Sequence, residues 1–124
     1  MNPTLETLFL SQISAFQPTV IPLPSSKSES NRALVIDALT EGENKLSNLA
    51  EARDTQTMIR LLGENPAIFD VLDAGTTMRF LTAFASATNQ NKVMTGTPRM
   101  CERPIGILVD ALREIGAEIH YMNK

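Results

Sequence analysis

An internal repeat constrains the fold of this chain more than any other feature of its sequence. When the sequence is shifted by 47 residues, five identities align in its middle part, among them Arg32 with Arg79. The order of the expected helices and strands repeats as well, which is typical of a chain built from copies of one supersecondary unit. We therefore expect an α/β fold of two copies, residues 19–66 and 67–124, with the boundary at Asn65-Pro66.

The first copy opens with β-branched residues at 19–24, which predict a strand. Ser26 and Glu29 follow with the spacing of a capping box, so we expect a helix from Ser26 to about Thr40 that stops at Gly42.

A short strand is expected from Leu46, and then a second helix. Asp54 is suited to cap this helix and Gly63 to end it. Its inward side chains are expected to be Thr55, Met58, Ile59 and Leu62.

The second copy is expected to open at residues 71–75, and to contain a helix at 76–88, a strand at 93–95, a helix from Arg103 to Gly116 and a strand at 117–121. Pro104 fits the first turn of that last helix, because its missing N–H has no intrahelical partner there.

Composition excludes several classes of protein. With 43% hydrophobic and 20% charged residues, the 124-residue chain suits one globular domain rather than a disordered segment. A net charge of -3 disfavours nucleic acid as a partner. The single cysteine excludes an internal disulfide and a multi-cysteine zinc site. No apolar run approaches the roughly 18 residues of a membrane span, so we expect a cytoplasmic chain without a membrane partner.

The candidate site lies at two expected helix starts, where free N–H groups and a partial positive charge favour an anion. Lys27 and Ser28 stand at the first start, and Arg32 follows one turn later on the same face. Gly75 and Arg79 occupy the matching place in the second copy. The alternative interpretation is a pair of ordinary helix starts with solvated surface cations.

A third basic cluster contains Arg99 and Arg103, just before the last expected helix. It suits a second anion, or it is a solvated loop in which Arg103 pairs with Glu102 or Asp110. His120 and Cys101 have no nearby partners in the sequence, and we interpret them as structural or surface residues. 

Three segments, residues 23–34, 74–79 and 96–106, together resemble the motifs of the 3-phosphoshikimate 1-carboxyvinyltransferase (EPSP synthase) family. The resemblance covers about residues 19–121 and keeps the family's order. It implies transfer of the enolpyruvyl group of phosphoenolpyruvate to the 5-hydroxyl of shikimate 3-phosphate, with release of phosphate. This step belongs to the shikimate pathway to chorismate and the aromatic amino acids, and needs no metal or organic cofactor.

The family fold has two domains, each an inside-out α/β barrel of three βαβαββ units. The resemblance implies that this chain holds two units and lacks the third unit and the other domain, against which residues 1–18 would pack. It also implies that the chain is not catalytic alone. Full-length family members are usually monomers, whereas an uncovered apolar face here is expected to favour self-association.

The resemblance also assigns roles to individual residues. Lys27, Ser28 and Arg32 would hold shikimate 3-phosphate. Phosphoenolpyruvate would be held by Lys27, Gly75 and Arg99, with Lys27 assisting the chemistry. The supporting residues would be Asp73, Thr76 and Arg79.

The chain departs from the family pattern in its short link at residues 65–70 and at four motif positions, namely Ser25 for glycine, Asp73 for asparagine, Thr77 for alanine and Phe80 for proline. Asp73 would repel an anion unless it points away or pairs with a cation.

Two other functions remain open at the level of sequence. The sister enzyme UDP-N-acetylglucosamine 1-carboxyvinyltransferase shares the fold, but it usually carries a reactive cysteine where this chain has Pro98. The other is a non-catalytic anion-binding module.

Overall fold

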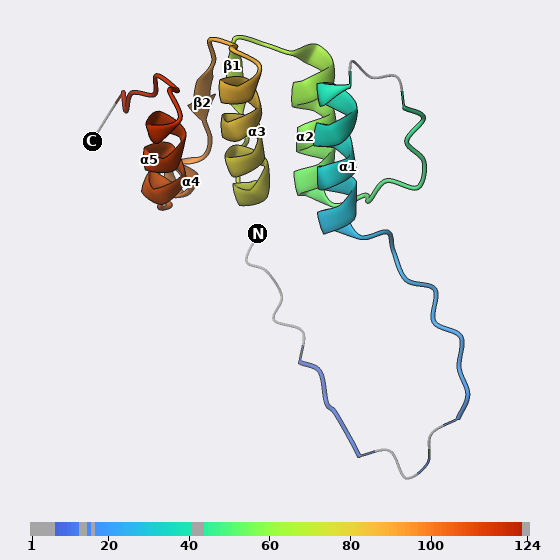
Figure 1. Ribbon diagram of the computed structural model, residues 1–124. Helices are drawn as coiled ribbons and strands as arrows, with labels where there is room; N and C mark the ends of the chain where they lie inside the picture. The colour runs from blue at the N-terminus through green and yellow to red at the C-terminus, as the bar shows by residue number, and fades with distance from the viewer. Residues whose placement is uncertain (1–6, 13–14, 16, 41–43, 123–124) are drawn as a thin grey trace.

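The computed structural model describes residues 7–12, 15, 17–40 and 44–122. Its elements are α1 (Lys27–Leu39), α2 (Arg53–Glu64), β1 (Ile68–Asp70), α3 (Gly75–Ala87), β2 (Val93–Thr95), α4 (Pro98–Cys101) and α5 (Gly106–Glu114). Figure 1 shows α1 beside α2, α3 in the middle, and α4 with α5 on the far side of the strands. None of the described helices is long and apolar enough to cross a membrane.

The two strands form a small parallel sheet in which Phe69 lies opposite Met94. Helix α3 makes the crossover between them, which is the connection that parallel neighbours require. Two further backbone hydrogen bonds extend the ladder, from Val71 N to Thr95 O at 2.9 Å and from Val93 N to Ala67 O at 3.0 Å. The coarse expectation of an α/β chain is thus confirmed.

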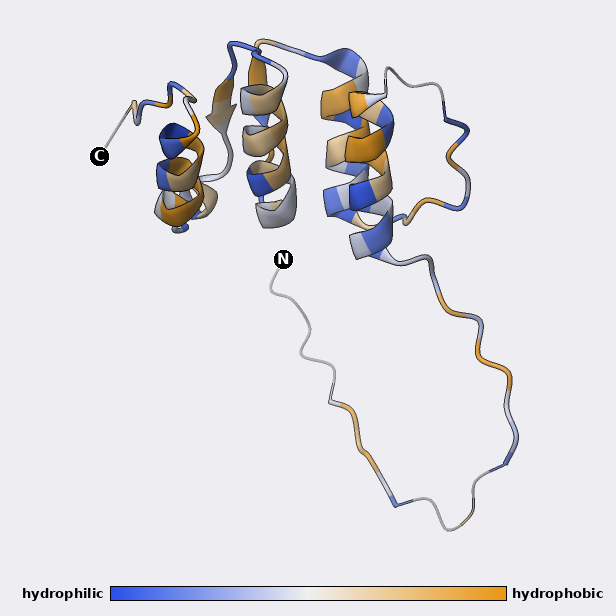
Figure 2. Ribbon diagram, in the orientation of Figure 1, coloured by the Kyte–Doolittle hydropathy of each residue, from blue (hydrophilic) through white to orange (hydrophobic). Residues whose placement is uncertain are grey.

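The hydrophobic core lies between the sheet and the helices α2, α3 and α4. Its buried members are Leu61, Phe69, Val71, Leu81, Phe84 and Met100. Because the core draws on all these elements, it fixes the positions from which α2 and α3 begin. Figure 2 shows that hydrophobic residues also occur along the extended N-terminal segment, where Leu8, Phe9 and Leu10 are exposed.

Helix α1 forms as its capping box predicts. The hydroxyl of Ser26 accepts a hydrogen bond from the Glu29 backbone N–H at 3.3 Å. The expected stop at Gly42 lies outside the described residues.

Helix α2 differs from the prediction at both ends. Its N-cap is Ala52, and Asp54 lies in the first turn instead of capping it. Gly63 lies inside the helix, which ends at Asn65 in the left-handed region with φ 45°. Asparagine tolerates that conformation better than most residues, so it serves as the terminator here. Of the side chains expected to point inward, Thr55 and Met58 are buried, as is the unforeseen Leu61.

The predicted strands at 19–24, from Leu46 and at 117–121 are wrong for the described chain, because these segments pair with no other strand. A strand is stabilised by its neighbour, and β-branched residues alone do not supply one. Strand β1 ends just before residues 71–75, where the second copy is expected to open, and those residues lead into α3. The prediction of β2 is confirmed.

The last helix begins later than its sequence predicts, at Gly106 instead of Arg103. A short helix, α4, precedes it in the chain, with Thr97 as its N-cap and Pro98 as its first residue. After the end of α4, Arg103 N donates a hydrogen bond to Met100 O at 3.1 Å. Pro104 therefore belongs to the turn between α4 and α5. Gly116, with φ 102°, follows the end of α5 as expected.

The first helices of the two expected copies are α1 and α3. Helices α1 and α3 both have 13 residues, and their starts are separated by nearly the offset of the sequence repeat. The expected first copy contains α1 and α2, and the described residues between these helices, 40 and 44–52, form no strand. The βαβαββ units and the boundary near Asn65-Pro66 stay predictions.

Candidate functional site

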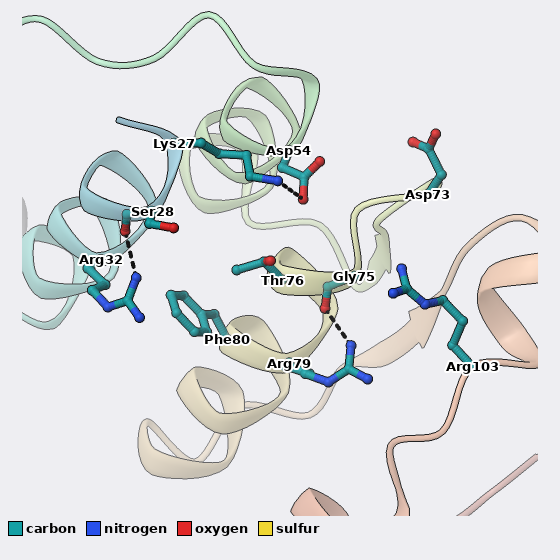
Figure 3. A pocket seen from close by; sticks show the side chains of 10 residues that line it. All are labelled: Lys27, Ser28, Arg32, Asp54, Asp73, Gly75, Thr76, Arg79, Phe80 and Arg103. Carbon is teal, nitrogen blue, oxygen red and sulfur yellow. Dashed lines mark hydrogen bonds and ion pairs between the residues drawn. The ribbon is translucent and has the colours of Figure 1, made fainter. Parts of the chain in front are cut away.

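A hollow of about 510 Å³ lies where the N-terminal ends of three helices meet (Figure 3). Lys27 is the first residue of α1, Asp54 the second of α2 and Gly75 the first of α3. The complete lining is Lys27, Ser28, Arg32, Asp54, Asp73, Gly75, Thr76, Arg79, Phe80 and Arg103. The free backbone N–H groups at the N-termini of these helices therefore lie near one another, together with several charged side chains.

The charge of the hollow is opposite to that of the chain. Four of its side chains are cationic and two are carboxylates, whereas the whole chain carries a net charge of -3. The helix N-termini add partial positive charge in the same place. The arrangement favours an anion at this position.

Lys27 and Asp54 face each other across the starts of α1 and α2. Lys27 Nζ lies 3.6 Å from Asp54 Oδ2, and the Lys27 side chain is 47% exposed. The backbone oxygen of Asp54 also accepts a hydrogen bond from Thr77 Oγ1 at 3.0 Å, which ties α2 to α3. These contacts hold the ammonium of Lys27 at the hollow while leaving it accessible.

Arg32 is held from two sides. Its Nη1 donates to Ser28 O at 2.9 Å, and its guanidinium carbon lies 5.6 Å from the centre of the Phe80 ring. Within the described chain its Nε and Nη2 make no hydrogen bond to protein. The guanidinium therefore has a fixed position and donors left for a ligand.

Arg79 differs from Arg32, because both of its terminal nitrogens donate hydrogen bonds to backbone carbonyl oxygens. Nη1 donates to Gly75 O at 3.0 Å, and Nη2 donates to Pro104 O at 2.8 Å. Arg79 thus joins the start of α3 to the turn between α4 and α5.

Gly75 leaves the space that Arg103 occupies. An ideal Cβ at Gly75 would lie 2.5 Å from Arg103 Nη1 and 3.4 Å from Arg79 Nη1. The first of these distances is too short for any real contact, so a side chain here requires Arg103 to move.

Asp73 pairs with a cation outside the hollow. Its Oδ2 lies 3.4 Å from Arg53 Nη1, and its side chain is 58% exposed. In Figure 3 the carboxylate points away from Gly75. Both of the conditions under which an aspartate is compatible with an anion site are therefore present.

Buried hydrogen bonds hold α1 in place beside α2 and the segment that precedes α2. Thr55 Oγ1 donates to Asn31 Oδ1 at 2.8 Å and joins α2 to α1. Ser30 Oγ accepts from the Ala50 backbone N–H at 2.9 Å. Asn31 and Thr55 are fully buried, so these bonds fix the relative position of the two helices that carry Lys27 and Asp54.

The structure brings together seven of the residues singled out from sequence: Lys27, Ser28, Arg32, Asp73, Gly75, Thr76 and Arg79. Arg99 is exposed on α4 and does not line the hollow, so its role with phosphoenolpyruvate stays a prediction.

Asp54, Phe80 and Arg103 also line the hollow. From the sequence, Phe80 was noted as a departure from the family motif and Arg103 as part of a separate basic cluster, whereas Asp54 was expected only to cap a helix. Arg103 forms no ion pair with Glu102 or Asp110 in the described chain, and Asp110 pairs instead with Arg113 at 3.5 Å. Within the same residues, no group of three His, Cys, Asp or Glu side chains is placed to hold a metal ion.

Comparison with known proteins identifies the family. The family model described as EPSP synthase (3-phosphoshikimate 1-carboxyvinyltransferase) matches residues 11–65 and 63–124. The chain is 55% identical over 112 residues to the 3-phosphoshikimate 1-carboxyvinyltransferase of Bacteroides fragilis strain YCH46, covering 90% of this chain and 26% of that protein. It is 39% identical over 146 residues to the protein of that name from Yersinia pestis, covering 97% and 34%. No solved structure matches significantly. The chain belongs to the EPSP synthase family.

The chain spans about a quarter to a third of the length of these relatives. The two matched segments overlap at residues 63–65. The alignment to the Yersinia pestis protein is longer than this chain, so that relative has additional residues within the aligned region.

Proposed function

We propose that this chain forms one wall of the substrate site of a 3-phosphoshikimate 1-carboxyvinyltransferase. The observation that carries the proposal is the convergence of three helix N-termini and four cationic side chains on one hollow. Both substrates of that reaction are polyanions, and they require fixed cations and backbone N–H groups. The name shared by the relatives adds the identity of the substrates.

In the proposed reaction, the 5-hydroxyl of shikimate 3-phosphate gives up its proton as its oxygen bonds to C2 of phosphoenolpyruvate, and C3 takes up a proton. This addition passes through an oxocarbenium-like centre and gives a tetrahedral adduct. The adduct then loses phosphate from C2 and a proton from C3, which restores the double bond in the product. Fixed cations stabilise the phosphate as it departs.

Lys27, Ser28 and Arg32 are proposed to hold shikimate 3-phosphate. Support comes from the unoccupied donors of Arg32 and the accessible ammonium of Lys27. Lys27, Gly75 and Arg99 are proposed to hold phosphoenolpyruvate, and Lys27 also to assist proton transfer at the reacting oxygen.

The strength of binding by this wall can be estimated from its contacts. Three charge-assisted hydrogen bonds contribute roughly 5–9 kcal/mol, and association costs about 4 kcal/mol or more. The resulting dissociation constant is about 0.2 mM or weaker. We therefore propose that this chain alone binds the substrates weakly and does not convert them to product. We also propose that the reaction takes place in the cytoplasm.

Saturation-transfer NMR on the 124-residue chain tests this proposal, with shikimate 3-phosphate and unphosphorylated shikimate as separate ligands. We expect transfer to the phosphorylated ligand only, its loss in Lys27→Ala, and no phosphate release when phosphoenolpyruvate is added. Equal transfer to both ligands, or transfer that Lys27→Ala leaves unchanged, would overturn the proposal.

A further inference from the structure

We infer that Phe80 is a positioning residue of the hollow, which holds the Arg32 guanidinium ready for the bound anion. This inference rests on the proposed function, because it assigns a supporting residue to one contact with shikimate 3-phosphate. Arg32 belongs to α1 and Phe80 to α3. Figure 3 shows the Phe80 ring directly beside the Arg32 guanidinium, whose central carbon lies 5.6 Å from the ring centre.

Ser28 and Phe80 together leave one complete edge of the Arg32 guanidinium free. Nη1 donates to Ser28 O at 2.9 Å, and the ring of Phe80 attracts the cation electrostatically. Among the residues that the structure describes, Nε and Nη2 have no hydrogen-bond acceptor. These two nitrogens are neighbours on the guanidinium and form a fork that matches two oxygens of one phosphate or carboxylate.

An exposed arginine needs such support, because ordering a long side chain on binding costs conformational entropy. Arg32 is exposed, and Ser28 ties it only to its own helix. Phe80 is half-buried and stands next to Leu81, a core residue that fixes α3. The ring is therefore a stable surface against which Arg32 is ordered before the anion arrives.

The surroundings of Phe80 favour this role over two simpler ones. Phe80 is not among the described residues that form the hydrophobic core or pack against it, so its side chain is not placed mainly for packing. It is also the one hydrophobic side chain among the described residues that line the hollow. A polyanionic substrate gains little from a hydrophobic ring, whereas a guanidinium is attracted to the face of that ring.

NMR titration of the isotope-labelled 124-residue chain with shikimate 3-phosphate tests the inference, with the Arg32 Nε–Hε resonance as reporter. In Phe80→Leu we expect a dissociation constant about three-fold higher than in wild type. The Arg32 resonance of the free chain should also lose the shift that the aromatic ring current gives it. Phe80→Tyr keeps the ring, so it should restore the resonance and hold the dissociation constant within about 1.5-fold of wild type.

The matched control is Phe84→Leu, which removes an aromatic ring one turn further along α3. Phe84 belongs to the core and does not line the hollow. This variant should lower the free energy of unfolding and leave both the Arg32 resonance and the affinity unchanged.

A double-mutant cycle separates positioning from direct contact between Phe80 and the substrate. Arg32→Gln should raise the dissociation constant about ten-fold, because it removes a charge-assisted contact. In that background Phe80→Leu should have little further effect, since the ring acts through Arg32. An unchanged three-fold effect would show that Phe80 contacts the substrate itself, and the positioning role would be wrong.

The inference is also overturned if Phe80→Leu alters the Arg32 resonance and the affinity no more than Phe84→Leu does. If this happens while Lys27→Ala abolishes binding, the inference fails and the proposed function stands. If wild type shows no saturable shift with shikimate 3-phosphate, both fail.

Discussion

Gly75 and Arg103 occupy adjoining space, so that an ideal Cβ on Gly75 would lie 2.5 Å from Arg103 Nη1. The first residue of α3 and the turn before α5 are therefore matched to each other. The match links the backbone N–H groups of α3 to a cation supplied from a distant part of the chain.

Gly75→Ala is predicted to weaken anion binding without unfolding the chain. The new methyl group forces the exposed Arg103 side chain to move, so the dissociation constant for phosphate should rise about three-fold. Gly63→Ala is the matched control, because Gly63 lies in α2 with open space around its Cβ position. That change should stabilise the chain by about 0.5–1 kcal/mol and leave the affinity unchanged. Thermal unfolding and phosphate titration of both variants measure these effects, and equal affinities in the two variants would refute the prediction.

Asp73→Asn is predicted to strengthen anion binding about two-fold, because it removes a carboxylate from the rim of the hollow. Arg53→Gln should weaken binding by a similar factor, since Asp73 then loses the cation 3.4 Å away. Once Asp73→Asn is present, Arg53→Gln should have little further effect. Titrations at low and high salt measure this coupling, which should shrink as salt increases. Additive effects at low salt would show that the two residues act independently.

Thr55→Val is predicted to destabilise the chain by about 1–3 kcal/mol. The substitution removes the hydroxyl that donates to Asn31 Oδ1, and Asn31 Nδ2 is already buried without a partner in the described structure. Thr57→Val is the control, since Thr57 is buried in the same helix and its hydroxyl forms no hydrogen bond with the described residues. Chemical denaturation of both variants checks the prediction, and equal changes in unfolding free energy would contradict it.

Helix starts were predictable where the signal is local. The Ser26 hydroxyl and the Glu29 N–H lie within one turn, so their spacing alone predicts the start of α1. Lys27, Ser28 and Arg32 could be placed at one site for the same reason. The strands expected at 19–24 and 117–121 failed because pairing depends on a distant neighbour that the described chain does not supply.

The place of Arg103 could not be predicted because it depends on contacts between distant segments. The sequence favours a helix that begins at Arg103-Pro104. In the structure, α4 ends before these residues and α5 begins after them, so both lie in the turn between the two helices. Arg79 then holds Pro104 O beside Gly75, and this contact joins residues 25 positions apart. The one local signal was the pair of arginines, Arg99 and Arg103, which does not reveal which of them faces the hollow.

An NMR titration of the labelled chain is the first test of whether the hollow selects shikimate 3-phosphate, as we propose. Shikimate 3-phosphate, phosphoenolpyruvate and UDP-N-acetylglucosamine are added separately to wild type and to Lys27→Ala. We expect saturable shifts at Ser28 and Arg32 with shikimate 3-phosphate, no such shifts with UDP-N-acetylglucosamine, and loss of the shifts in Lys27→Ala. A folded spectrum without shifts at these residues, or with the same shifts in Lys27→Ala, would contradict it.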